Sequence, residues 1–328
     1  MTGPTSPDTL QVQPASWVPM AVIAMGQTLT TLNISALPVL IGAMVDEFSI
    51  APTTVASAIV IYSIAVSGFI MLGAKLGQKY GSTTIFRCST ILLLLAAAMT
   101  ASSNSFRWLL VAQGLSGLGA AMLLPSLVVL ITDNYSGHQQ AKAIGLLGGV
   151  QAAATVATIL IAGLVGTHLG WRYSFGLIVP FAALTWLLSY RLKPSEQQLD
   201  LKIDRIGAAL AALAIGLISL GFNFINEWGP IRAFATAPSG PLGISPALLM
   251  ILLGMLGMQL FIVWVKHRKK ANKTPLLAIE VIESRSERMA VVALIAIVAI
   301  GSALNFMIPL YIQMVQGQNS LDTAMALI

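Results

Sequence analysis

The chain has 328 residues, of which 56% are apolar and only 9% are charged. A soluble protein carries roughly 25% charged residues, so this composition excludes an ordinary water-exposed surface and indicates one that faces lipid. The net charge of +6 does not indicate nucleic acid, because the cations stand in short segments between apolar runs, where they orient a membrane protein. The single cysteine, Cys88, excludes an internal disulfide and a cysteine-based metal site.

Residues 1–16 contain no Lys or Arg, so the basic region of a cleavable signal peptide is missing, and their Pro and Thr content predicts a disordered N-terminus. Long apolar segments follow, each near the roughly 20 residues that a helix needs to cross the hydrocarbon core. They are continuously apolar rather than alternating, which favours helices over barrel strands. The nine predicted spans are Trp17–Val45, Thr53–Ala74, Cys88–Ser105, Trp108–Thr132, Ala143–Thr167, Tyr173–Tyr190, Ile206–Asn226, Ile244–Val265 and Met289–Met314.

Lys and Arg are distributed unequally between the two sides of these spans. Fifteen of the 18 fall on the side of the N-terminus, and only Arg107, Arg172 and Arg232 fall on the other. Because short loops rich in Lys and Arg stay in the cytoplasm, we predict a multi-pass inner-membrane protein with a cytoplasmic N-terminus. Nine is an odd number of spans, and Thr323–Ile328 resembles the start of a tenth, so we expect a C-terminally truncated chain.

A short motif occurs twice. The pattern Leu-Pro-x-Leu surrounds Pro38 and again Pro125, and an aspartate, Asp46 or Asp133, follows each proline by eight residues. The first span runs outwards and the fourth inwards, so the two copies have inverted topology. Inverted repeats are typical of secondary transporters. The motif therefore favours a transporter, with coincidence as the alternative.

Five longer motifs follow one another in the order found in one transporter family. They are Ala74-Lys75-Leu76-Gly77-Gln78-Lys79-Tyr80-Gly81, Gln113-Gly114-Leu115-Ser116-Gly117-Leu118-Gly119-Ala120-Ala121, His168-Leu169-Gly170-Trp171-Arg172-Tyr173-Ser174-Phe175, Asp204-x-x-Gly207 and Pro309-Leu310-Tyr311-x-Gln313. Through them the chain resembles the major facilitator superfamily, and within it the fourteen-span drug:proton antiporters. The resemblance implies an all-α, polytopic transmembrane helical bundle. Its parts would be a six-helix bundle in residues 17–192, two inserted helices in 204–265 and the beginning of a second bundle in 288–328.

The resemblance also implies a function. It predicts a secondary active transporter that exports a small hydrophobic or drug-like compound by alternating access, rather than an enzyme. The expected partners are a small-molecule substrate and the lipid bilayer, with protons left open, and neither nucleic acid nor a cofactor is expected. Three scattered histidines predict no metal site. Gly77, Gln78, Lys79 and Gly81 match the family's gating loop. The alternatives are a non-transporting membrane scaffold or sensor with the same fold, or an inactive fragment.

The sequence departs from the family at residues with mechanistic roles. Gln78 stands where the family's loop has Asp, and Gln113 stands where its fourth span has Arg. A buried ionisable group usually marks a proton or ion path, and we find none inside the first six predicted spans, because Asp46, Glu47 and Asp133 stand at span ends. The question of whether transport is coupled to protons therefore stays open.

Neutral polar side chains inside the spans are the remaining candidates for a substrate path. The first six predicted spans offer no anion that could hold a cationic drug. The alternative is that these groups only form hydrogen bonds between helices, each contributing roughly 0.6 kcal/mol. The substrate-path candidates are Gln27, Thr31, Asn33, Gln113, Ser116, Gln151 and Asn305.

Overall fold

The computed structural model describes residues 16–238, 243–271, 276 and 284–327. The predicted disordered N-terminus, residues 1–16, lies outside these ranges except for Ser16. The described ranges are built from helices, and an isolated bridge pairs Arg232 with Ile244. The helices are α1 (Val18–Phe48), α2 (Pro52–Tyr80), α3 (Ser82–Ala101), α4 (Phe106–Asn134), α5 (Gly137–His168), α6 (Trp171–Gly176), α7 (Ile178–Leu188), α8 (Arg205–Trp228), α9 (Pro246–Lys270), α10 (Arg285–Met314) and α11 (Ser320–Ala326).

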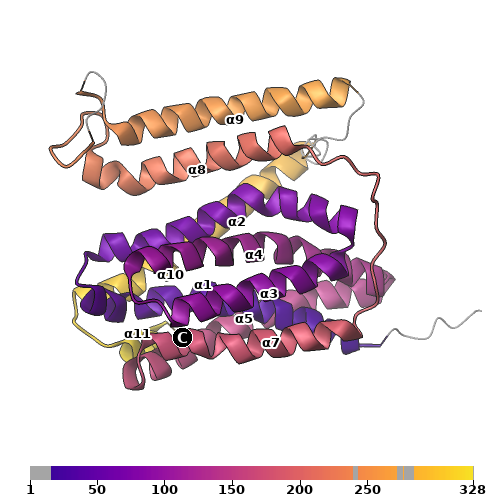
Figure 1. Ribbon diagram of the computed structural model, residues 1–328, viewed down its shortest axis with the longest axis horizontal. Coiled ribbons are helices and arrows are strands. Elements are labelled where there is room, and N and C mark those ends of the chain that lie inside the picture. Colours follow the sequence, from indigo (N-terminus) through magenta and orange to yellow (C-terminus); the bar gives the residue numbers. More distant parts are fainter. Residues whose placement is uncertain (1–15, 239–242, 272–275, 277–283, 328) are drawn as a thin grey trace, which may run out of the picture.

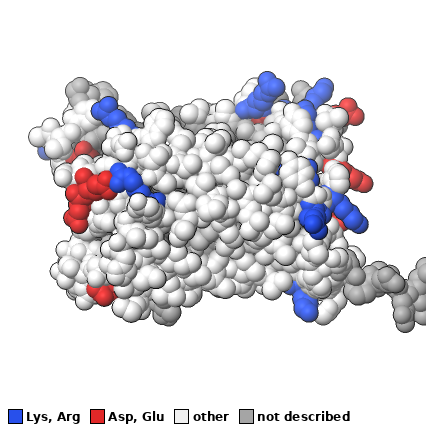
Figure 2. Space-filling model, turned by 60° about the horizontal axis from the view of Figure 1, so that its bottom comes forward, with Lys and Arg blue, Asp and Glu red and all other residues white. Residues whose placement is uncertain are grey.

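Nine helical segments in the described ranges are long and apolar enough to cross a membrane, counting α6, α7 and the turn that follows as one. They correspond one to one with the nine predicted spans, so the prediction of a polytopic helical bundle is confirmed. Charged side chains lie toward the two ends of the molecule on the face shown in Figure 2, with a wide uncharged band between them. This is the distribution that a bilayer imposes on a spanning protein.

Helices α1 to α7 pack together, and α8 and α9 form a hairpin beside them (Figure 1). Within the apolar windows of α1 and α4, 56% of residues are buried, which makes these two helices the centre of the bundle. Helix α8 lies between α9 and α2, and α10 contacts α1. We call the two ends of the bundle the Glu47 end, where α1, α3 and α10 finish, and the Lys79 end, where α2 and α4 finish.

Close helix contacts depend on glycine. A Cβ on Gly73 of α2 would lie 2.9 Å from the backbone carbon atoms of Ala121 and Met122 in α4. A Cβ on Gly117 of α4 would lie 2.6 Å from Ala65 Cβ in α2. Small residues at such crossings let two backbones approach, which is the main way that helices associate in lipid.

The sixth predicted span, Tyr173–Tyr190, is divided in two. Helix α6 ends at Gly176, and α7 begins at Ile178 after a turn at Leu177. Pro180 has no N–H, so it cannot donate to the carbonyl of Gly176 four residues earlier. The break is the local consequence of this proline.

The loop predicted between the second and third spans is also shorter than expected. Helix α2 continues to Tyr80, so Gly77, Gln78 and Lys79 lie in its last turns rather than in a loop. Gly81 alone separates α2 from α3, with a φ of 84° that a glycine adopts without strain. The third helix begins at Ser82 rather than at Cys88.

The α8–α9 hairpin is joined at the Lys79 end by a buried carboxylate. Asp204, only 3% exposed, caps α8 by accepting from the N–H of Gly207 at 2.9 Å. It also accepts from Trp264 Nε1 of α9 at 3.1 Å and pairs with Arg268 Nε at 3.4 Å. One side chain therefore holds together the first turn of α8 and the last turns of α9.

Candidate functional site

A cavity of about 350 Å³ lies between α1, α2, α5 and α10. Helices α1, α2 and α5 form most of its wall, and α10 together with Leu327 supplies the remainder. Its lining mixes amides and hydroxyls with aliphatic and aromatic carbon, and among the described residues none that line it is charged. The lining residues are Thr31, Ile34, Ser35, Pro38, Val39, Ile59, Ser63, Gln151, Thr155, Ile159, Ser302, Asn305, Phe306 and Leu327.

Three of the predicted path residues meet in this cavity. Thr31 comes from α1, Gln151 from α5 and Asn305 from α10, three helices far apart in the sequence. Thr31 Oγ1 donates to the carbonyl of Gln27 at 3.0 Å, and Asn305 Nδ2 donates to the carbonyl of Gly301 at 2.8 Å. These bonds to their own helices satisfy the donors locally, so the groups tolerate an apolar neighbour in the cavity.

The other four predicted path residues lie in the protein interior and do not line this cavity. Asn33 Nδ2 of α1 donates to Ser116 Oγ of α4 at 2.5 Å, and Gln113 Nε2 contacts Thr100 Oγ1 of α3 at 3.5 Å. Gln27 is also buried. The geometry of Asn33, Gln113 and Ser116 is that of hydrogen bonds between helices. Asn33 Oδ1 and Gln113 Oε1 are buried without a hydrogen-bond partner among the described residues.

The gating-loop candidates contact the segment that follows α7. The carbonyl of Gln78 accepts from the N–H of Gln198 at 3.1 Å, and Gly77 and Gln78 line a cavity of about 370 Å³ with residues 193–196 and 198. In the same place Asp133, the aspartate of the second Leu-Pro motif, accepts from Ser195 Oγ at 2.7 Å. Gly81 lies against the carbonyl of Ser195, 3.0 Å from where a Cβ would stand. Lys79 faces another way, toward the ring of Tyr80.

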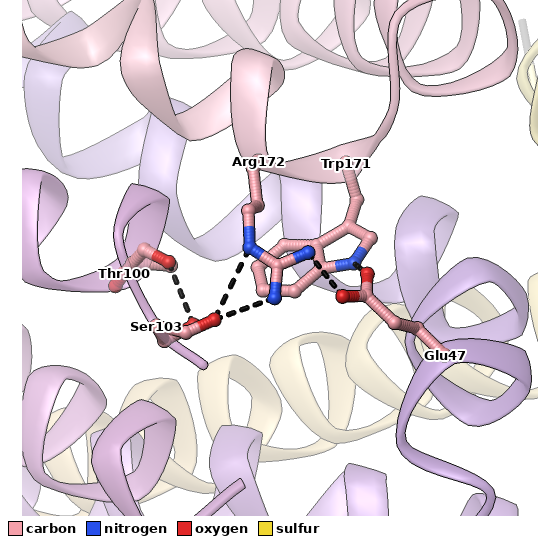
Figure 3. A network of polar contacts seen from close by, with 5 residues as sticks. All are labelled: Glu47, Thr100, Ser103, Trp171 and Arg172. Carbon is pink, nitrogen blue, oxygen red and sulfur yellow. Dashed lines mark hydrogen bonds and ion pairs between the residues drawn. The ribbon is translucent and has the colours of Figure 1, made fainter. Parts of the chain in front are cut away.

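A polar network at the Glu47 end joins three helices (Figure 3). Glu47 of α1 forms an ion pair with Arg172 and accepts from Trp171 Nε1 at 2.5 Å. The Arg172 guanidinium donates to the carbonyl of Ser103, after α3, from Nε at 3.1 Å and from Nη2 at 2.6 Å. It also lies 4.5 Å from the centre of the Trp171 ring. The motif around Trp171 pointed to this turn, but the sequence did not identify Glu47 and Ser103 as its partners.

We expect Arg172→Gln to lower the free energy of unfolding by about 1–2 kcal/mol, since the pair is partly exposed and carries charge-assisted hydrogen bonds. Thermal unfolding of the purified protein in detergent measures the loss. The difference from wild type should shrink in high salt, which screens the ion pair. Arg107→Gln removes an exposed cation from the same end and serves as the control. An equal loss in both variants would show that the network contributes nothing.

Sequence reasoning missed Gln313 of α10, the residue that ties α10 to α1. The residue is 8% exposed, and its side-chain amide contacts α1 at Pro38, Val39 and Gly42. The motif that ends in Gln313 marked the residue, but no local pattern names a partner more than 270 positions away.

Comparisons with known proteins agree on the class. The family model described as Major Facilitator Superfamily matches residues 23–328. The chain is 20% identical over 302 residues to the riboflavin transporter RibZ of Clostridioides difficile (strain 630), covering 92% of this chain and 61% of that protein. It is 24% identical over 201 residues to the methylenomycin A resistance protein of Bacillus subtilis (strain 168), covering 61% of this chain and 43% of that protein.

Solved structures show the same fold. A crystal structure of the peptide transporter POT in complex with sulfate is similar with a TM-score of 0.59 at 14% identity, covering 96% of this chain and 66% of that one. The chain thus spans about three fifths or less of the length of the curated relatives named above.

Proposed function

The chain belongs to the Major Facilitator Superfamily, and from this premise we propose that it is a secondary active transporter that exports a small, uncharged organic compound. The observation that carries the proposal is the cavity of about 350 Å³ between α1, α2 and α5 on one side and α10 on the other. In transporters of this design the substrate binds between repeats near the middle of the membrane. A volume of this size suits a small organic molecule.

The lining determines the proposed substrate class. Gln151 and Asn305 offer amides, while Ile59, Ile159 and Phe306 offer apolar contact. A charged compound would lose its hydration there without meeting an opposite charge among the described lining residues, which is costly in a low-dielectric site. The names of the relatives, a riboflavin transporter and a resistance protein, support an organic substrate.

The orientation and the driving force belong to the same proposal. By the distribution of Lys and Arg, the Lys79 end faces the cytoplasm and the Glu47 end faces outwards. Protons remain the candidate coupling ion of the fourteen-span antiporters that the sequence resembles. Since no described lining residue is ionisable, a proton would have to bind elsewhere than in this cavity.

Transport into sealed vesicles tests the proposal. Vesicles that contain the protein are given either riboflavin, which is uncharged, or ethidium, a cation, with and without an imposed pH gradient. We expect riboflavin but not ethidium to move, and Gln151→Leu to reduce its flux several-fold, by the loss of hydrogen bonds of about 1 kcal/mol each. Gln140→Leu, on the same helix but outside the cavity, is the matched control and should transport normally.

The alternative function is a membrane scaffold or sensor that keeps the fold without transport. It predicts that neither compound moves although the protein inserts correctly. Faster movement of ethidium than of riboflavin would contradict the proposed substrate class while leaving transport itself in place.

A further inference from the structure

The amide of Gln313, near the end of α10, contacts the backbone of α1. Its Oε1 accepts from the N–H of Gly42 at 2.7 Å, and its Nε2 donates to the carbonyls of Pro38 at 3.3 Å and Val39 at 3.1 Å. The acceptor and the donor of one side-chain amide therefore both bind a single turn of α1. With 8% of its surface exposed, Gln313 is nearly buried in this contact.

The turn that Gln313 contacts directly follows a weak point of α1. Pro38 lies inside the helix, and because it has no N–H, the carbonyl of Ile34 four residues earlier loses its helical hydrogen bond, which tends to kink the chain. The carbonyl of Pro38 and the N–H of Gly42 are four residues apart, which is the pair that a regular helical turn would join. The Gln313 amide has the same donor and acceptor as a peptide group, so it gives the backbone groups at both ends of this turn an additional partner.

Gly42 makes the approach possible. A Cβ at this position would lie 2.8 Å from Gln313 Oε1, closer than two such atoms can stand. A side chain on α1 at residue 42 would therefore push the amide away. The contact requires glutamine on α10 and glycine on α1, and each can be tested separately.

The contact lies beside the cavity, toward the Glu47 end. Pro38 and Val39, whose carbonyls bind Gln313, also line the cavity, and so do Asn305 and Phe306 two turns earlier on α10. The Glu47–Arg172 network at the same end joins only helices of the first bundle. Gln313 instead joins α1 to α10, the two helices that face each other across the cavity.

We propose that Gln313 is an access latch: its amide docks on the Pro38–Gly42 turn of α1, closes the outer side of the cavity, and releases when the cavity opens outwards. This inference rests on the proposed transport function and its orientation. Neutral amide hydrogen bonds contribute modestly to stability because water replaces them when they break. Such a contact suits a gate that must open and close in every cycle.

Accessibility of the cavity to a thiol reagent tests the latch without a substrate. Cys88 is exposed and is first replaced by Ser, and Ser63 of α2, a lining residue, is replaced by Cys as the reporter. A charged, membrane-impermeant methanethiosulfonate is added to the outside of whole cells. We expect Gln313→Ala to raise the labelling rate about tenfold, the scale set by losing neutral hydrogen bonds.

Two further variants separate a latch from a general loss of structure. Gly42→Ala alters the partner helix and should raise labelling as Gln313→Ala does. Gln316→Ala, which changes an exposed glutamine at the same end, should leave labelling unchanged. Protein abundance in the membrane and thermal unfolding should stay near wild type in all three variants.

The result that overturns the latch is unchanged outside labelling in both Gln313→Ala and Gly42→Ala. Increased labelling only from the cytoplasmic side also overturns the latch, because the contact would then close the cytoplasmic side of the cavity rather than its outer side. Flux of riboflavin is measured on the same variants. Faster outside labelling without riboflavin flux in any variant would support the latch and contradict the proposed substrate, so the two failures are distinguishable.

Discussion

Asp204→Ala is expected to destabilise the α8–α9 hairpin by about 2–4 kcal/mol, the combined cost of a lost helix cap and of lost charge-assisted hydrogen bonds at a buried carboxylate. Asp204 is 3% exposed, and its carboxylate serves the N–H of Gly207, the indole of Trp264 and the guanidinium of Arg268 at once. Alanine removes the helix cap, the acceptor of the indole and the negative charge together. Thermal unfolding in detergent and proteolysis of the hairpin measure the loss.

A short series of variants shows which part of Asp204 matters. Asp204→Asn keeps a good N-cap and an oxygen that accepts from Trp264, so it should lower the free energy of unfolding by less than Asp204→Ala does. Asp200→Ala, an exposed acid in the same connection, should be near neutral. Equal losses at residues 200 and 204 would refute the role of the buried carboxylate.

Gly73→Ala should also destabilise the protein, although it adds only one methyl group. The new Cβ would stand 2.9 Å from backbone atoms of Ala121 and Met122, and a backbone cannot turn aside as a flexible side chain can. Helices α2 and α4 would have to separate, and overpacking of this kind costs about 1–3 kcal/mol or more. Thermal unfolding and the amount of protein in the membrane are the measurements.

Gly77→Ala is the matched control, since residue 77 lies one turn later on the same face of α2. A Cβ there would be 3.5 Å from Ser82 Oγ, an ordinary contact. Alanine also has a higher helix propensity than glycine, so this variant should be as stable as wild type or more so. If both variants behave alike, steric contact between α2 and α4 is not the reason for glycine at residue 73.

The spans could be predicted from the sequence because the signal is local. A helix that crosses lipid must be long, apolar and free of charge along its middle, and each of these properties is visible in about 20 consecutive residues. Pro180 also indicated the break at Leu177, but a prediction based on apolar length alone does not detect such a break. The continuation of α2 to Tyr80 was missed because Lys75, Gln78 and Lys79 made a helical turn resemble a loop.

The site could be predicted only in part, because the polarity of a residue does not show which side of its helix faces the interior. In a helix surrounded by lipid and by other helices, both environments are apolar, so the sequence does not show which side faces the interior. Thr31, Gln151 and Asn305 face the cavity, whereas Gln113 and Asn33 face neighbouring helices. The partners of Gln313 and Asp204 depend on tertiary packing, which no local pattern contains.

Helix α2 separates the cavity from the α8–α9 hairpin. Ile59 and Ser63 line the cavity, while Ile64 and Gly68, the next residues along, lie against Gly216 and Ala212 of α8. Helix α8, with α9 outside it, therefore covers the flank of α2 that would otherwise meet the acyl chains of the bilayer (Figure 1). If the chain transports as proposed, a compound dissolved in the membrane has no direct path into the cavity across this flank.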